Sequence, residues 1–145
     1  MRYPFLLFIL CCTLLLHISC INCRTVDCQG PTGFIEVRLV KDGHNAVFGP
    51  DATVDADSIR FYSPGVFQNE VPIYYNDVSL ALDLYIEHGA TYILEIKNVR
   101  SDTIIGMMEV TGMGECCEAY DFTNVTINGQ VVCQAGCDEV IEVQL

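Results

Sequence analysis

The stretch that decides the fold is VSLALDLYIE, from Val78 to Glu87, in which apolar and polar side chains alternate. Alternation with a period of two is typical of a β-strand with one buried face, because successive side chains point to opposite sides of the sheet. The same alternation recurs outward from it, at Ile35–Leu39, Tyr92–Ile96 and Ile141–Leu145. No window carries a sustained helical stripe, so the sequence predicts an all-β fold with little or no helix.

Glycine-containing pairs separate the predicted strands. Each of four such pairs lies between two apolar runs: Asp42-Gly43, Pro64-Gly65, His88-Gly89 and Asn128-Gly129. Asn-Gly is the strongest of these signals, since both residues accept the positive φ of a two-residue hairpin turn. Short strands with turns about every 8 to 12 residues predict a single Ig-like β-sandwich domain, which we place at residues 33–145.

The first nineteen residues have the form of a signal peptide. Arg2 precedes a 13-residue apolar run that ends at Leu16, and a membrane-spanning helix needs about 18 or more such residues. The tripeptide Ile18-Ser19-Cys20 then resembles a bacterial lipobox, although His17 stands where an apolar residue is usual. We therefore predict a signal peptide at residues 1–19 and lipidation of Cys20 by palmitate-type acyl chains. Ordinary signal-peptidase cleavage nearby is the alternative, but no A-x-A-like site follows.

The chain is acidic, with 19 Asp and Glu residues against 7 Lys and Arg residues and a net charge of −12. A surface of this sign repels phosphate backbones and anionic lipid headgroups. It therefore predicts no nucleic-acid partner and no membrane attachment through a basic patch. The expected partners are a membrane, reached through the N-terminal lipid, and an envelope protein or a glycan. No motif in the sequence requires a cofactor.

Nine cysteines occur in the chain. Two leave with the signal peptide and an acylated Cys20 cannot pair, so an even number remains. In an exported protein these read first as disulfide partners. Cys116 and Cys117 are adjacent and would face opposite sides of a strand, so we expect each to bond a separate partner, one from the early cysteines and one from the late ones. The six disulfide candidates are Cys23, Cys28, Cys116, Cys117, Cys133 and Cys137.

Residues 20–32 form a cysteine-rich segment without strand periodicity, which ends close to Gly30-Pro31. We interpret it as a tether that Cys23 or Cys28 pins to the domain. A structural zinc site is the alternative use of the thiols, because zinc binds cysteines in closely spaced pairs. Its four ligands would be Cys23, Cys28, Cys133 and Cys137.

Several short motifs together give the chain a resemblance. The stretch from Cys23 to Pro31 reads C-x4-C-x-G-P, the pair Cys116-Cys117 follows an acidic middle, and Asn128-Gly129 precedes Cys133. In these features the chain resembles small uncharacterised exported lipoproteins of Bacteroidota-type Gram-negative bacteria. The resemblance covers most of the mature chain and implies an address in the cell envelope, without an activity. Residues 21–24 lack the acidic run of surface-exposed lipoproteins, which favours an outer-membrane anchor that faces the periplasm.

Few side chains suggest chemistry. Asp51, Asp55 and Asp57 are weak calcium candidates, since Ca²⁺ takes six to eight oxygen ligands, but their spacing is not the D-x-D-x-D-G pattern and we favour a solvated loop. His44 and His88 lie at predicted turns, and no serine lies in a G-x-S-x-G motif. We therefore name no catalytic residue.

Exposed aromatic rings are what carbohydrate-binding domains require, and tyrosines are available. Tyr74 and Tyr75 are neighbours, so we expect at most one of the two rings to be exposed and favour a packing role for it. The tyrosines concerned are Tyr62, Tyr74, Tyr75 and Tyr120. Three tripeptides also resemble glycosylation signals, the last for N-glycans: Asp57-Ser58-Ile59, Asp102-Thr103-Ile104 and Asn124-Val125-Thr126.

The sequence thus supports one functional hypothesis and two alternatives. The hypothesis is a lipid-anchored cell-envelope β-domain that acts as a non-enzymatic binding or structural module. The first alternative is an exported hydrolase with an acidic cleft, which would bring two carboxylates together in a pocket. The second is a eukaryotic secreted domain stapled by disulfides, which a glycan on Asn124 would support.

Overall fold

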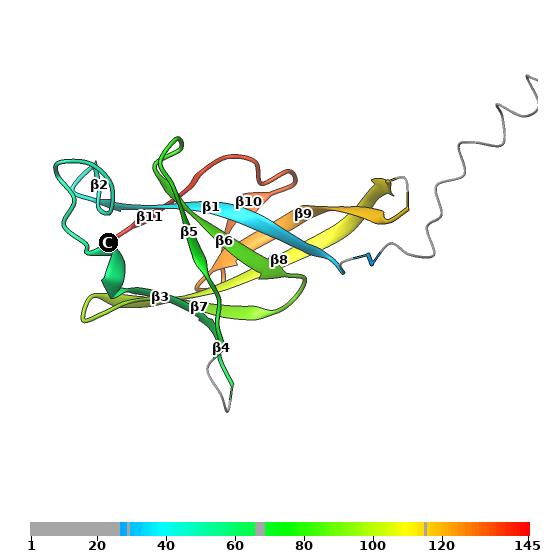
Figure 1. Cartoon of the computed structure of the whole chain (residues 1–145), viewed down its shortest axis with the longest axis horizontal. Helices are drawn as coiled ribbons and strands as arrows, with labels where there is room; N and C mark the ends of the chain where they lie inside the picture. Colours follow the sequence, from blue (N-terminus) through cyan, green and yellow to red (C-terminus); the bar gives the residue numbers. More distant parts are fainter. Residues whose placement is uncertain (1–26, 29, 66–68, 115) are drawn as a thin grey trace, which may run out of the picture.

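A computed structural model describes residues 27–145 except 29, 66–68 and 115 (Figure 1). Within these residues almost all regular structure is β-strand, and the only helical element is a single 3-10 turn, η2 (Ala56–Ser58), which Asp55 caps. None of the described residues forms a helix long and apolar enough to cross a membrane. The signal-peptide and Cys20 predictions concern residues outside the described part.

The first sheet, sheet A, contains the beginning and the end of the domain. Its strands follow the order β11-β1-β6-β5, and β2 pairs with the end of β1. β1 and β11 run parallel, with Val37 opposite Ile141, whereas the other pairs are antiparallel. The strands are β1 (Thr32–Lys41), β2 (His44–Asn45), β5 (Ile73–Asn76), β6 (Ala81–Glu87) and β11 (Ile141–Gln144).

The second sheet, sheet B, is antiparallel throughout, in the order β10-β9-β8-β7-β3-β4. β8 and β9 form a long hairpin that continues beyond the region where the two sheets overlap (Figure 1). The strands are β3 (Ile59–Ser63), β4 (Asn69–Glu70), β7 (Thr91–Ile96), β8 (Arg100–Met113), β9 (Glu118–Ile127) and β10 (Gln130–Gln134).

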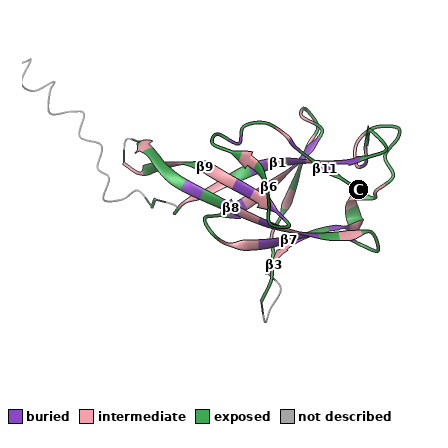
Figure 2. Cartoon of the chain, turned by 180° about the vertical axis from the view of Figure 1, so that it is seen from behind, coloured by how far each residue is buried: buried purple, intermediate pink, exposed green. Residues whose placement is uncertain are grey.

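The core lies between the two sheets. The inward positions of each strand are apolar and buried, and the outward positions are mostly half-buried or exposed (Figure 2). This pattern confirms the predicted all-β fold of two packed sheets. The largest fully buried apolar side chains are Phe61, Ile35, Leu39, Leu82, Leu84, Ile86, Leu94, Ile96 and Ile104.

The fold-deciding stretch begins with a turn. The predicted strand starts at Ala81, three residues later than expected, because residues 77–80 form a turn in which Leu80 has φ 53°. The Asn76 Oδ1 accepts hydrogen bonds from the N–H groups of Val78 and Ser79, 3.0 and 3.1 Å away, which holds this turn. Val78, expected in the buried row, is 95% exposed.

Two disulfides are described, which confirms the prediction that the domain contains disulfide bonds. Cys28–Cys117 spans 89 residues and ties the described end of the tether to the tip of the β8–β9 hairpin. Cys116 is also disulfide-bonded. Cys116 and Cys117 lie in the bend before β9, so strand alternation does not set their directions. Cys23 lies outside the described residues.

The predicted long-range partner for Cys133 or Cys137 is wrong, because these two residues bond each other. Ala135 and Gly136 take φ values of 54° and 65° and turn the chain back, so that the two cysteine Cα atoms lie 5.7 Å apart. Three of the four thiols in the zinc alternative are therefore already disulfide-bonded, and that site is not formed.

Gly106, in the middle of β8, is packed so closely that a substitution there tests the packing around it. A Cβ atom there would lie 2.8 Å from Phe122 Cε1 and 3.1 Å from Ile86 Cγ2. We expect Gly106→Ala to lower the free energy of unfolding by about 1–3 kcal/mol through overpacking. Gly112→Ala in the same strand is the matched control, since nothing lies within 4 Å of its Cβ. Equal urea midpoints for the two variants would contradict this account of the packing.

Candidate binding surface

Three aromatic side chains meet on the outer face of sheet A, and we call them the aromatic face: Phe34 of β1, Tyr74 of β5 and Tyr85 of β6. The ring centroid of Phe34 lies 6.0 Å from that of Tyr74 and 5.3 Å from that of Tyr85. Phe34 is 52% exposed and Tyr74 is 54% exposed. A cluster of large, solvent-exposed hydrophobic side chains marks an interaction site more often than a single exposed one does.

Strand register builds the aromatic face. Ile35 and Leu84 point into the core, so their neighbours Phe34 and Tyr85 point outward, directly opposite each other in the β1–β6 pair. Tyr74 joins them from β5, which is the last strand of sheet A on that side. Phe34 and Tyr85 were not among the candidates from the sequence, although their outward positions in alternating strands were the signal that identifies them.

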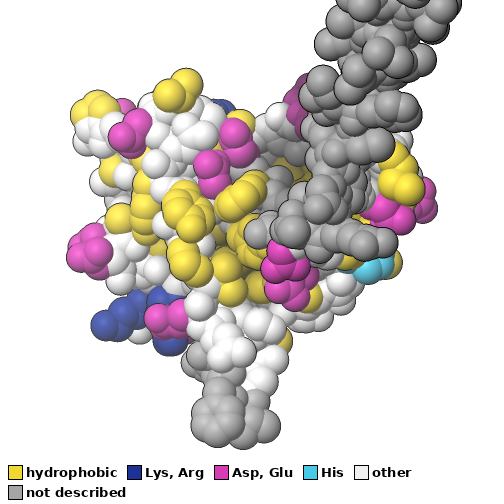
Figure 3. All heavy atoms as spheres, turned by 45° about the vertical axis from the view of Figure 1, so that its right-hand side comes forward, with side chains coloured by type: hydrophobic (Ala, Val, Ile, Leu, Met, Phe, Trp, Pro, Cys, Tyr) yellow, Lys and Arg dark blue, Asp and Glu magenta, His cyan; other side chains and the backbone are white. Residues whose placement is uncertain are grey.

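Carboxylates border the aromatic face. Asp83 lies opposite Glu36 of β1 and opposite Tyr74 of β5, and Glu87 ends the same outward row of β6. Within the described part of the chain, none of these three carboxylates is in an ion pair; Asp83 only accepts a long hydrogen bond, 3.5 Å, from Asn76. Figure 3 shows one side of the domain where hydrophobic side chains gather, with acidic side chains nearby.

A hollow of about 190 Å³ adjoins Phe34. β11 pairs with β1 only from Val37 onward, so the edge of the first half of β1 is open there. The hollow lies between this edge, β9 and the loop before β11, and no lysine or arginine lines it. Its side chains are aromatic and acidic, apart from one disulfide cysteine: Phe34, Tyr120, Phe122, Asp121, Asp138 and Cys137. Rings and two carboxylates therefore surround a space of side-chain size.

Tyr120 in this hollow donates a hydrogen bond from its hydroxyl group to Glu118. This bond, with a smaller contribution from burial and from the Glu118 charge, raises the pKa of Tyr120. The phenol is therefore neutral at physiological pH, and the negative charge of the hollow comes from its carboxylates.

A second pocket of about 570 Å³ lies at the open side between β3, β4, β5 and η2. Tyr75 lines it and donates a hydrogen bond to the Ala56 carbonyl, 3.1 Å away, and burial, followed by the charges of Asp57 and Asp55, raises its pKa. The expectation that only one of Tyr74 and Tyr75 is exposed is wrong, since Tyr75 is 41% exposed. β5 is an edge strand, so sheet B does not cover its inner face there.

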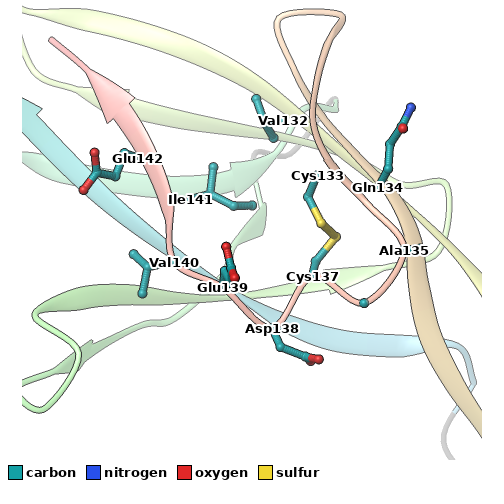
Figure 4. Close-up of a pocket in the computed structure, with 11 residues that line it drawn as sticks. Val132, Cys133, Gln134, Ala135, Cys137, Asp138, Glu139, Val140, Ile141 and Glu142 are labelled. Carbon is teal, nitrogen blue, oxygen red and sulfur yellow. A yellow bond between two sulfur atoms is a disulfide. The ribbon is translucent and has the colours of Figure 1, made fainter.

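A third hollow, about 730 Å³, is formed by one continuous segment, residues 132–142. In Figure 4 the Cys133–Cys137 disulfide lies at its wall, and Asp138, Glu139 and Glu142 come from the connection to β11 and from β11 itself. No group of three or more His, Cys, Asp or Glu residues in the described ranges is placed to hold a metal ion.

The calcium candidates are not brought together. Asp51 lies 3.8 Å from His44, while Asp55 accepts the N–H of Asp57 as the cap of η2, so each carboxylate has a local role. His88 is at a turn, as predicted, but its Nδ1 accepts the backbone N–H of Met108 at 2.9 Å, which gives it a structural role.

The remaining sequence candidates lie on the scaffold. Tyr62 packs under the guanidinium of Arg60, whose carbon lies 5.4 Å from the ring centroid. Of the glycosylation motifs, Ser58 lies in η2, Thr103 in β8 beside buried Asp102, and Asn124 in β9 with its Oδ1 buried. No protein-family model, curated protein or solved structure matches this chain.

Proposed function

We propose that this chain is a lipid-anchored, non-enzymatic binding module of the cell envelope, and that the aromatic face is its binding surface. The observation that carries the proposal is a group of three aromatic rings on the outer side of sheet A, in which Phe34 contacts both Tyr74 and Tyr85 and in which Phe34 and Tyr74 are more than half exposed. Aromatic residues in such clusters supply most of the energy of protein interfaces, because they bury a large area for few rotatable bonds.

The architecture supports an anchored module. The signal peptide and the lipobox at Ile18-Ser19-Cys20 predict export and acylation. The Cys28–Cys117 disulfide joins the tether to the tip of the β8–β9 hairpin. Phe34 lies only two residues into β1, so the aromatic face begins close to the end of the predicted tether, residues 20–32.

The anchor is tested by the intact mass of the full chain, produced in a Gram-negative host and extracted from membranes. We expect a mature chain that starts at Cys20 and carries acyl groups, and we expect Cys20→Ala to leave the membrane fraction. An unacylated chain with a different start would contradict the lipid anchor.

The binding surface is tested by photo-cross-linking in the same cells. A photoreactive amino acid replaces Tyr74 of the aromatic face or, as control, Val99, which is exposed in the turn between β7 and β8 of sheet B. We expect a discrete cross-linked product from position 74 and none from position 99. Equal products from both positions, or no product from position 74, would remove the aromatic face as the binding surface.

A further inference from the structure

We infer that the partner of the aromatic face is a protein segment that presents arginine or lysine side chains, one of which enters the hollow beside Phe34. This inference rests on the proposed function and assigns the chemistry of its partner. It depends on three features of the surface: the angles between the rings, the distribution of charge and the size of the hollow.

The rings are not coplanar and do not form a flat platform. The plane of Phe34 makes an angle of 73° with that of Tyr74 and 60° with that of Tyr85. A sugar ring stacks best on a coplanar surface, whereas a cation is attracted to any ring face within about 6 Å. The chain already makes this kind of contact within itself, between Arg60 and Tyr62. The geometry therefore favours a cationic side chain.

The charge closest to the rings is negative, and Arg38, the cation on the same outward row of β1, is paired with Glu142. Glu36, Asp83 and Glu87 border the aromatic face, and Asp121 and Asp138 line the hollow. None of these five is in an ion pair with another part of the described chain. With a net charge of −12 for the whole chain, the field at this surface attracts cations and repels anionic partners.

The hollow is sized for one side chain. Its volume is about 190 Å³, and Phe34 belongs both to the hollow and to the aromatic face, so the two form one continuous surface. A guanidinium there would lie against aromatic rings and within reach of carboxylates from two elements, β9 and the loop before β11. The surrounding rings lie on an open sheet face, which a free small cation would leave uncovered and an extended protein segment would cover.

The test is calorimetric titration of the detergent-solubilised, disulfide-bonded mature chain with a blocked hexa-arginine peptide at 0.15 M salt. Because an acidic protein attracts such a peptide non-specifically, the variants are matched in charge. We expect Phe34→Leu, which keeps an apolar side chain but removes the ring, to weaken binding about tenfold. Val78→Ala, also uncharged and exposed in the turn before β6, should change it less than twofold.

The carboxylates are tested in the same way. We expect Asp121→Asn with Asp138→Asn to weaken binding about tenfold. Asp51→Asn with Asp55→Asn is the control with the same change in charge, at the other end of β1 and beyond β2, and should change binding less than twofold. Equal losses in the two double variants, or full binding by Phe34→Leu, would overturn the inference. Circular dichroism confirms that each variant is folded.

The inference and the proposed function fail in different ways. If position 74 cross-links and hexa-arginine does not suppress the product, the aromatic face is still a binding surface. The inference that its partner is cationic would then be overturned. If hexa-arginine suppresses the cross-link and hexa-glutamate does not, the result supports both the binding surface and the cationic partner. Loss of the cross-link altogether would overturn the proposed surface whatever the peptide does.

Discussion

Replacing Phe61 with alanine lowers the free energy of unfolding by about 3–5 kcal/mol, the largest effect we expect from a single core substitution in this domain. Phe61 is the largest fully buried side chain, and its ring stacks on that of Tyr92 with centroids 5.0 Å apart. It lies on β3 where sheet B faces sheet A, so truncation removes contacts to both layers. The rigid strands cannot close the resulting cavity completely.

The measurement is urea unfolding followed by far-ultraviolet circular dichroism, with the disulfides kept oxidised. Val78→Ala is the control, because that side chain is 95% exposed and its loss should change stability by less than about 0.5 kcal/mol. Phe61→Leu should fall between the two, since it leaves a smaller cavity. A Phe61→Ala loss below that of Phe61→Leu would show that this residue is not at the centre of the core.

Breaking the buried ion pair of β8 is the second large effect. Asp102 is 1% exposed, and its Oδ1 accepts hydrogen bonds from Arg100 and, at 2.6 Å, from Asn128 of the β9–β10 turn. Arg100 also donates to the Gln144 carbonyl of β11, so the pair links the two sheets. We expect Arg100→Met to cost about 3 kcal/mol, because it leaves a buried carboxylate without its counter-charge.

A double variant separates charge burial from simple loss of contact. Arg100→Met with Asp102→Leu should recover at least half of the single-variant loss, because no uncompensated charge stays buried and the exposed Asn128 amide can turn to water. Arg60→Met is the control, since Arg60 pairs with Glu70 and Glu95 at the surface, where such pairs contribute about 0–1 kcal/mol. The same urea series measures all three variants. A loss in the double variant as large as that of Arg100→Met alone would show that the cost does not come from leaving the Asp102 carboxylate without its counter-charge.

The local elements of the fold were predictable from the sequence because they depend on near neighbours. Alternation placed the strands around Ile35, Leu94 and Ile141, and Asn128-Gly129 placed the β9–β10 hairpin, where both residues have positive φ. Alternation also continued through Val78, where the chain instead turns. There the side chain of Asn76 accepts hydrogen bonds from two backbone N–H groups. A hydrophobic pattern does not indicate such bonds.

The candidate binding surface was not predictable in the same way. Whether Tyr75 is exposed depends on β5 being an edge strand, and the aromatic face depends on β6 lying between β1 and β5 in one sheet. The partners of the cysteines depended likewise on the turn at Ala135 and Gly136 and on the bend at Cys117. The exposed surface and the disulfide pairs bring together residues that are distant in sequence, or they depend on a single unusual backbone angle. Neither is visible in a local pattern.

Amino-acid pattern therefore set the class of the domain, its turns, its acidic charge and its use of disulfides, because each follows from local periodicity or from composition. Only the packing of the strands decided their order and which edges stay open. It also decided that Phe34 meets Tyr74, Tyr85 and the hollow at Asp121. The physical reason is that a period of two assigns a side chain only to one of the two faces of a sheet. Its neighbours on that face are determined by the pairing of whole strands. That pairing minimises the exposed apolar area of the entire core.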